Sequence, residues 1–176
     1  EEQGVLHGIS FHLESGQTMG LLGRTGSGKT TLVRLLFRLY DATEGRILLN
    51  GTDITQTALA SLRQQVGFVT QDVQLFQGTV RQNMTFFDES ISDERLLEVL
   101  AELGLEQWLA TLPNGLDTQL QAGGGGLSAG EAQLLALTRV LLKDPGLVIL
   151  DEASSRLDPV TEKLLTRAFD RLLIGR

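Results

Sequence analysis

Several stretches of the chain carry apolar residues at every third or fourth position, which is the spacing of one helix face. Residues 93–103 follow this pattern, and Ser92 just before them is a suitable N-cap, so this stretch predicts a helix. A shorter helix is expected over 106–112, which ends before a Pro-Asn-Gly turn. A third helix is expected over 129–142, which is apolar on several faces and stops before a Pro-Gly pair.

Short apolar runs bounded by turn residues predict strands. The runs 66–69 and 147–150 are almost wholly apolar and predict buried strands, and 18–22 has the same character. Residues 46–49 lie between two turns and predict another strand. Apolar residues in loosely alternating positions within 5–13 predict a strand pair near the start of the chain.

This order of elements predicts one α/β domain over 1–176, with a mostly parallel sheet, an N-terminal antiparallel β part and an inserted α-helical subdomain. We expect the core to comprise about 1–72 and 143–176, and the helical subdomain about 73–142. The chain starts at a Glu and ends where a helix should lead into another element. We therefore expect a segment that is truncated at both ends.

Composition excludes several classes of protein. The formal net charge of −7 gives no general attraction to nucleic acid or to an anionic membrane surface, so no nucleic-acid partner is expected. The absence of Cys excludes a disulfide framework and a thiolate metal site. No apolar run approaches the roughly 18 residues that cross a bilayer, and no signal peptide opens the chain.

The most specific motif lies between the predicted strand 18–22 and a helix expected over 31–37. It matches the phosphate-binding pattern GxxxxGK[ST], in which glycines let backbone N–H groups face phosphate oxygens. Lys29 would supply a cation to the β and γ phosphates of ATP, and Thr30 a hydroxyl to Mg²⁺. We therefore expect a P-loop NTPase core. The expected nucleotide contacts here are Gly23, Arg24, Thr25, Gly26, Ser27, Gly28, Lys29, Thr30 and Thr31.

Two carboxylates follow the predicted strand 147–150, at the end of a parallel strand where α/β sheets bind ligands. Asp151 would hold Mg²⁺ directly or through water. Glu152 would accept a proton from the attacking water or orient that water. Taken alone, the pair is more readily interpreted as solvated residues at a strand end, and the phosphate loop in the same chain reverses this preference in favour of the catalytic interpretation.

A second anion site is predicted at the start of the helix 129–142, where Ser128 and Gly130 offer a hydroxyl, free N–H groups and the positive end of the helix dipole. One triphosphate already has its loop at 23–30, so a second site suggests another ligand or a partner's nucleotide. A purely local alternative stays open, in which Ser128 and Glu131 form a capping box.

The order of these motifs resembles the nucleotide-binding domain of ABC transporters, over nearly the whole chain. The motifs are the phosphate loop, Gln71, Leu127-Ser128-Ala129-Gly130-Glu131, the strand that ends in Asp151-Glu152, and Ser155-Arg156-Leu157-Asp158. The resemblance implies that Ser128 and Gly130 act in trans on ATP held by a second nucleotide-binding domain, identical or not, in a head-to-tail dimer. It also implies that Gln71 senses Mg²⁺ and the attacking water, as a metal and catalytic residue, and that Asp158 lies at the dimer interface.

Residues 75–83 and 112–118 look like segments of the exporter branch of that family. The resemblance implies a transmembrane domain, commonly on the same polypeptide, and a location at the cytoplasmic face of a membrane, where ATP hydrolysis powers export. The region after Gln71 would face this membrane domain. For Phe76 and Phe87 an interior position in the subdomain is an equally weighted alternative, and Trp108 is expected to be a packing residue.

The chain departs from the family pattern at Ala129, Glu131 and Arg156. The resemblance also places an adenine-stacking aromatic before residue 1 and a switch histidine beyond residue 176. We therefore expect weak nucleotide binding and poor hydrolysis from this segment alone. Two alternatives to an exporter ATPase stay open: a degenerate partner domain, and a soluble ABC ATPase acting on DNA or ribosomes. A P-loop kinase or GTPase would not explain residues 127–131.

Overall fold

The structure is a computed structural model that describes residues 5–70, 73–121, 126–151 and 159–174. Gln71 and Glu152 lie outside the described residues, as do the residues of the motif 155–158. The helices are α1 Lys29–Leu36, η1 Ile54–Gln56, α2 Leu59–Gln65, α3 Val80–Thr85, α4 Asp93–Leu103, α5 Glu106–Thr111, η2 Gly115–Asp117, α6 Ala129–Lys143 and α7 Pro159–Leu173. The strands are β1 Leu48–Leu49, β2 Thr52–Asp53, β3 Val66–Val69, β4 Gly78–Thr79, β5 Gln119–Leu120 and β6 Leu147–Leu150.

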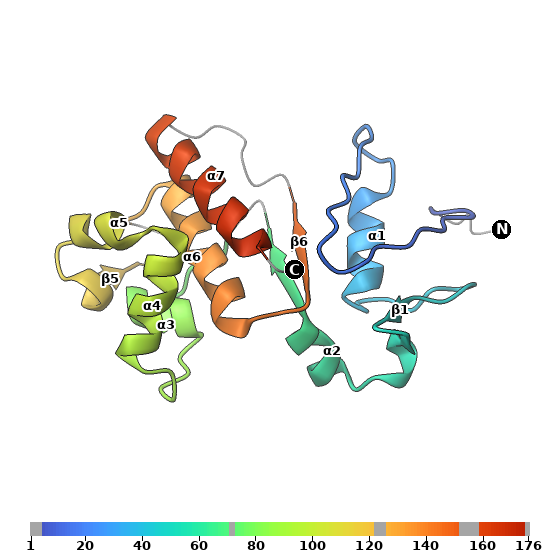
Figure 1. Cartoon of the computed structure of the whole chain (residues 1–176), viewed down its shortest axis with the longest axis horizontal. Helices are drawn as coiled ribbons and strands as arrows, with labels where there is room; N and C mark the ends of the chain where they lie inside the picture. The colour runs from blue at the N-terminus through green and yellow to red at the C-terminus, as the bar shows by residue number, and fades with distance from the viewer. Residues whose placement is uncertain (1–4, 71–72, 122–125, 152–158, 175–176) are drawn as a thin grey trace.

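A parallel pair of strands, β3 and β6, lies at the centre of the molecule (Figure 1). Their register pairs Val66 with Leu147 and Val69 with Leu150. Helix α6 packs against β3, and α7 packs against α6. A small cluster of Ile54, Leu62 and Val66 lies beside β3 and β6, and the C-terminal end of α1 joins it through Phe37. The described residues thus form the mixed α/β arrangement that the sequence predicts.

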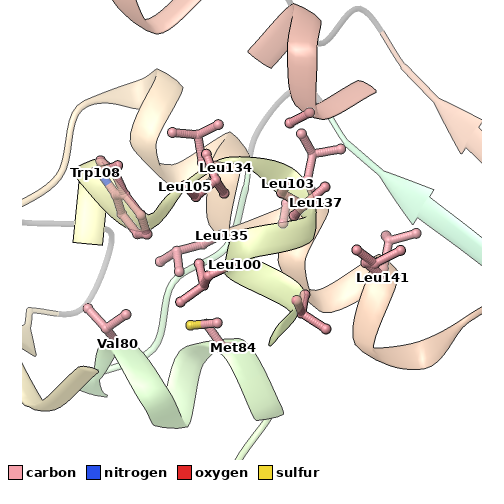
Figure 2. Packing of buried hydrophobic residues seen from close by; sticks show 14 of the residues in the cluster. Val80, Met84, Leu100, Leu103, Leu105, Trp108, Leu134, Leu135, Leu137 and Leu141 are labelled. Atoms are coloured by element: carbon pink, nitrogen blue, oxygen red, sulfur yellow. The ribbon is translucent and has the colours of Figure 1, made fainter. Parts of the chain in front are cut away.

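The main hydrophobic core is built from helices α3 to α7 and β3 (Figure 2). Most of its large, fully buried side chains are leucines, which α4 and α6 supply at helical spacing. Burying a leucine side chain contributes about 1.5–3 kcal/mol, so this cluster is the main source of stability in the described part of the chain. Because the core runs without a break from Val69 of β3 to Trp108 of α5, it fixes the position of the helical region against the sheet.

The predicted helices form at the expected places because their end signals are local. Ser92 caps α4 by accepting a hydrogen bond from the N–H of Arg95, and Gly104 ends that helix in the left-handed conformation at φ +71°. Helix α6 begins at Ala129 as expected and runs one residue further than predicted, to Lys143. The predicted strands 66–69 and 147–150 are confirmed with the same bounds.

The prediction for the N-terminal region was wrong in two respects. No strand forms in residues 5–28, so the expected strand pair in 5–13 and the expected buried strand 18–22 are both absent from the described chain. Leu21 and Leu22 are 42% and 98% exposed. An apolar run becomes a strand only when a neighbouring backbone pairs with it, and β3 and β6 pair with each other instead. The antiparallel β part that does form is the hairpin of β1 and β2, where only Leu48–Leu49 of the predicted 46–49 is strand.

Candidate functional site

The phosphate-binding motif forms a tight loop that leads directly into α1. The N–H of Ser27 donates to the carbonyl of Arg24 at 3.1 Å, and Gly26 has a left-handed backbone with φ +83°. At Gly23 a Cβ atom would meet the Ser27 hydroxyl oxygen, so a larger residue there would require the Ser27 side chain to move. Lys29 folds back over the loop, and its Nζ donates to the carbonyl of Gly23 at 2.6 Å. The loop therefore holds its one ammonium group at its own centre.

The N-terminus of α1 is open to an anion. Its N-cap is Gly28, which has φ +90° and no side chain to accept from the first N–H groups. The N–H groups of Lys29, Thr30 and Thr31 have no hydrogen-bond partner among the described residues, while that of Leu32 already donates to Gly28. A helix end with free N–H groups and the positive end of its dipole binds phosphate. The structure thus brings the predicted phosphate contacts of residues 23–31 together in one place.

Asp151 lies directly after β6 and continues its pairing with β3, because its N–H donates to the carbonyl of Val69 at 3.0 Å. Its side chain is half-buried. Its position at the carboxyl end of a parallel strand is the one that the sequence predicts. No contact between Asp151 and Lys29 is described, so their joint role stays a prediction.

The start of α6 carries both halves of a capping box. The Ser128 hydroxyl oxygen accepts from the N–H of Glu131 at 3.3 Å, and Oε2 of Glu131 accepts from the N–H of Ser128 at 2.7 Å. The local alternative for these two residues is therefore confirmed. Of the predicted anion site, Ser128 and Ala129 are exposed and Gly130 is buried, and the N–H groups of Ala129 and Gly130 have no partner in the described chain.

A contact that sequence reasoning missed joins α5 to this box. The indole Nε1–H of Trp108 donates to Oε1 of Glu131 at 3.1 Å. Trp108 is 5% exposed, which confirms its packing role. A buried indole N–H requires an acceptor, so a tryptophan on an apolar helix face was the one signal in the sequence that such a partner exists.

Three aromatic side chains form an exposed patch, which we call the Phe patch: Phe76, Phe86 and Phe87. Phe76 meets the other two rings edge to face at centroid distances of 6.1 and 6.0 Å. Phe76 and Phe87 are 44% and 48% exposed, so the interior alternative for these two residues is wrong. The guanidinium of Arg139 stacks on Phe86 at 4.6 Å and so connects α6 to the patch.

Beneath the patch lies a polar network centred on Asn83, which is fully buried. Its side chain bonds to both backbone groups of Phe76 and accepts from Arg139 at 3.2 Å. Arg139 also donates to the carbonyls of Asn83 and Gln74. Burial lowers the pKa of Arg139 to about 10, because the charged guanidinium is partly removed from water. Sequence reasoning missed this network, although an arginine inside an apolar helical stretch is a sign of one.

The described residues contain no group of three or more His, Cys, Asp or Glu that would hold a metal ion by itself. Mg²⁺ takes one or two protein oxygens and completes its shell with phosphates and water. The Thr30 hydroxyl and the Asp151 carboxylate are oxygen ligands of that kind, and the open end of α1 presents free N–H groups of the kind that suit phosphates. These residues therefore fit a magnesium nucleotide. In the part of the chain that the structure describes, no helix is long and apolar enough to cross a membrane.

Comparison with known proteins identifies the family. Residues 6–155 match the family model described as ABC transporter, which is most of the chain. The chain belongs to the ABC transporter family. A bacterial Atm1-family ABC exporter with ATP bound has the same fold, with a TM-score of 0.87 and 37% identity over 98% of this chain and 30% of that chain. The resemblance and the α/β fold expected of an ABC nucleotide-binding domain are thereby confirmed.

Curated ABC transporter proteins match over the same length. The ABC transporter ATP-binding protein YknV of Bacillus subtilis is 40% identical over 176 residues, which is 100% of this chain and 29% of that protein. The ATP-dependent lipid A-core flippase of Syntrophus aciditrophicus is 40% identical over 172 residues, 98% of this chain and 29% of that protein. YheH of Bacillus subtilis, whose name joins an ATP-binding and a permease part, is 40% identical over 100% of this chain and 26% of that protein. This chain therefore spans less than a third of the length of these relatives.

Proposed function

We propose that this chain is the ATPase domain of an ABC exporter, which binds ATP with Mg²⁺ and hydrolyses it to drive transport. The observation that carries the proposal is the open N-terminus of α1 behind the glycine loop, with Lys29 at the loop's centre. The likeness to an exporter described as having ATP bound supports it. Magnesium, when bound, neutralises charge that develops on the phosphates.

In this proposal the residues of the phosphate loop and those at the strand ends have separate roles in binding and catalysis. Lys29 pairs with the β and γ phosphates, and the Thr30 hydroxyl and the Asp151 carboxylate hold the metal ion. Gln71 orients the attacking water near the metal, and Glu152 takes its proton. Gln71 and Glu152 are assigned by their place in the sequence, because they lie outside the described residues. The division into a core of about 1–72 and 143–176 and a helical subdomain of about 73–142 stays part of the proposal.

The second half of the site comes from a partner domain, so that two domains close head to tail over two ATP molecules. What supports this is the position of the two anion-binding helix ends: α1 lies on one side of β6 and α6 on the other (Figure 1). Ser128 and Gly130 at the start of α6 would therefore meet ATP held by the other domain. The partner is a second copy of this chain or a homologous domain.

The Phe patch is the surface on which we place the transmembrane domain, on the same polypeptide and at the cytoplasmic face of a membrane. Exposed aromatic side chains are enriched at protein interfaces, and those of the Phe patch lie on the segment after Gln71. Relatives whose names join ATP-binding and permease parts support this arrangement. Replacing Phe76 by Ser in the full-length protein should lower transport per ATP hydrolysed, while the affinity for ATP stays unchanged.

Mixing two inactive variants tests the head-to-tail site directly. In a homodimer, Lys29→Ala and Ser128→Ala subunits are each expected to be inactive alone. A mixed dimer restores one complete site only if Ser128 acts on the partner's nucleotide, because both defects then fall on the same site. Partial recovery of ATP hydrolysis on mixing is the expected result, and none would refute action in trans. In a heterodimer, Ser128→Ala here should reduce nucleotide trapping at the partner's site.

Two controls complete the test. Ser90→Ala is a matched Ser-to-Ala change on an exposed loop, where the hydroxyl's one hydrogen bond among the described residues goes to Asp88, and it should leave turnover unchanged. Glu152→Gln separates an active ATPase from a degenerate partner domain. Loss of turnover with ATP retained supports catalysis at this site, whereas unchanged turnover would favour the degenerate alternative.

A further inference from the structure

Glu131 occupies a site that suits a carboxylate better than an amide. Its two oxygens each accept one N–H: Oε1 accepts from the Trp108 indole at 3.1 Å, and Oε2 accepts from the Ser128 backbone at 2.7 Å. An amide has only one acceptor, and its NH₂ group would face one of these donors. The two donors on either side therefore favour glutamate at position 131.

Trp108 in turn depends on Glu131. Its side chain is buried in the core of the helical region, and an indole N–H can only donate. Glu131 is the acceptor that the structure gives it. Trp108 thus supplies a donor and Glu131 an acceptor, and their hydrogen bond connects α5 to the first turn of α6.

The capping box links the Trp108–Glu131 hydrogen bond to the Ser128 hydroxyl. The hydroxyl oxygen accepts from the N–H of Glu131, so its own hydrogen is left to donate to an anion. The Glu131 carboxylate accepts from the backbone N–H of Ser128 with one oxygen and from the Trp108 indole with the other. Rotation of the Glu131 side chain would therefore remove one of the two hydrogen bonds that hold Ser128 in the capping box.

We propose that Trp108 and Glu131 are a positioning pair that orients the Ser128 hydroxyl toward the terminal phosphate of the partner's nucleotide. This inference rests on the proposed function, in which Ser128 acts on that phosphate. Two N–H donors and the positive end of the α6 dipole face the carboxylate of Glu131 and reduce its repulsion of an anion. A glutamate at position 131 is explained by the acceptor that the indole N–H of Trp108 on α5 requires.

A double-mutant cycle in the full-length transporter tests the pair. Glu131→Gln places an amide between two N–H donors and should lower kcat/KM for ATP hydrolysis about five- to tenfold, the change that one lost hydrogen bond produces. Trp108→Phe removes the indole donor and should lower kcat/KM by a similar factor. The two changes together should restore activity above that of Glu131→Gln alone, because the amide then faces only the Ser128 donor. Additive losses, or no loss from either change, would overturn the proposal.

Two further measurements separate positioning from folding. The dissociation constant of ATP should stay unchanged in all three variants, because the phosphate loop leads into α1 on one side of β6, whereas α5 and α6 lie on the other side (Figure 1). Thr111→Val is the matched control on α5, since it removes a hydroxyl that donates to the carbonyl of Trp108 at 2.6 Å without touching Glu131. It should leave kcat/KM unchanged. Loss of activity in this control equal to that of Trp108→Phe would refute a specific role for the indole.

Should Trp108→Phe fail to fold, Glu131→Gln and Glu131→Ala decide the question. The proposal expects the amide to recover little of the activity that alanine loses, and a fully active Glu131→Gln would contradict it. Ser128→Ala distinguishes failure of the proposed function of Ser128 from failure of the positioning pair alone. If it leaves turnover unchanged, the proposed function of Ser128 fails. If it abolishes turnover while the cycle is additive, only the positioning pair fails.

Discussion

Asn83 should be one of the most sensitive positions for the stability of this domain. It is fully buried, and its side chain makes four hydrogen bonds. Oδ1 accepts from the N–H of Phe76 at 2.8 Å and from Arg139 at 3.2 Å. Nδ2 donates to the carbonyls of Phe76 at 2.9 Å and Thr79 at 3.0 Å. Asn83→Ala removes all four and leaves buried polar groups without partners.

The expected cost follows from these contacts. A hydrogen bond contributes about 0.5–1.5 kcal/mol net, and a buried group left unpaired costs about 1–3 kcal/mol. Arg139 keeps two carbonyl partners, and Phe76 is partly exposed, so some of the loss is recovered from water. We expect Asn83→Ala to lower the free energy of unfolding by about 3–5 kcal/mol. At about 2–4 °C per kcal/mol for a domain of this size, Tm should fall by roughly 6–20 °C.

Urea titration and thermal unfolding, both followed by circular dichroism, measure this change. Asn114→Ala is the matched control, because Asn114 is exposed and its side chain makes no described hydrogen bond. It should change the free energy of unfolding by less than about 0.5 kcal/mol. A loss below about 1 kcal/mol for Asn83→Ala would contradict a structural role for this network, since it would mean that water replaces its hydrogen bonds at little cost.

Three further changes test other parts of the structure. Gly28→Ala requires alanine to adopt a left-handed backbone, at a cost of about 1–2 kcal/mol, and places a Cβ atom 2.5 Å from the Leu6 side chain. The affinity for ATP should therefore fall sharply in a titration, and unchanged binding would show that the loop tolerates a side chain at this position. Arg81→Ala breaks ion pairs with two exposed carboxylates and should cost at most about 1 kcal/mol, a difference expected to vanish in 1 M salt. Hydrogen bonds from Thr55 lower the pKa of Asp53, so its stabilisation is present at neutral pH and lost on acidification. The stability difference between wild type and Asp53→Asn should therefore begin to shrink as the pH falls below about 4 and disappear only below the lowered pKa of Asp53, and a constant difference across the titration would contradict this sign.

The α6 region explains why one departure from the family pattern does not need to weaken the site. A glutamate in the first turn of a helix is stabilised by the helix dipole, and here it also completes a capping box and accepts the Trp108 indole. Removing it would leave a buried N–H unpaired. The carboxylate is therefore explained by its local contacts.

Elements with local signals could be predicted from the sequence alone. Helix α4 has its N-cap at Ser92, its apolar face and its glycine stop within one continuous stretch, and its predicted bounds are the observed ones. The strands 66–69 and 147–150 were recognised because they are short, apolar and bounded by turns. The phosphate loop and the capping box of Ser128 and Glu131 are also local patterns, and both form as expected.

Tertiary structure alone decided the features that depend on distant partners. Whether 18–22 forms a strand depends on a neighbouring backbone, and no local pattern supplies one. The bond of Trp108 to Glu131 joins residues 23 apart, and the bonds of Arg139 to Asn83 join residues 56 apart. Hydrophobic periodicity specifies which face of a helix is buried, but the partner of a buried polar group is set by packing between helices. For that reason the sequence determined the motifs and their helices, while the contacts that hold them in position emerged only from the fold.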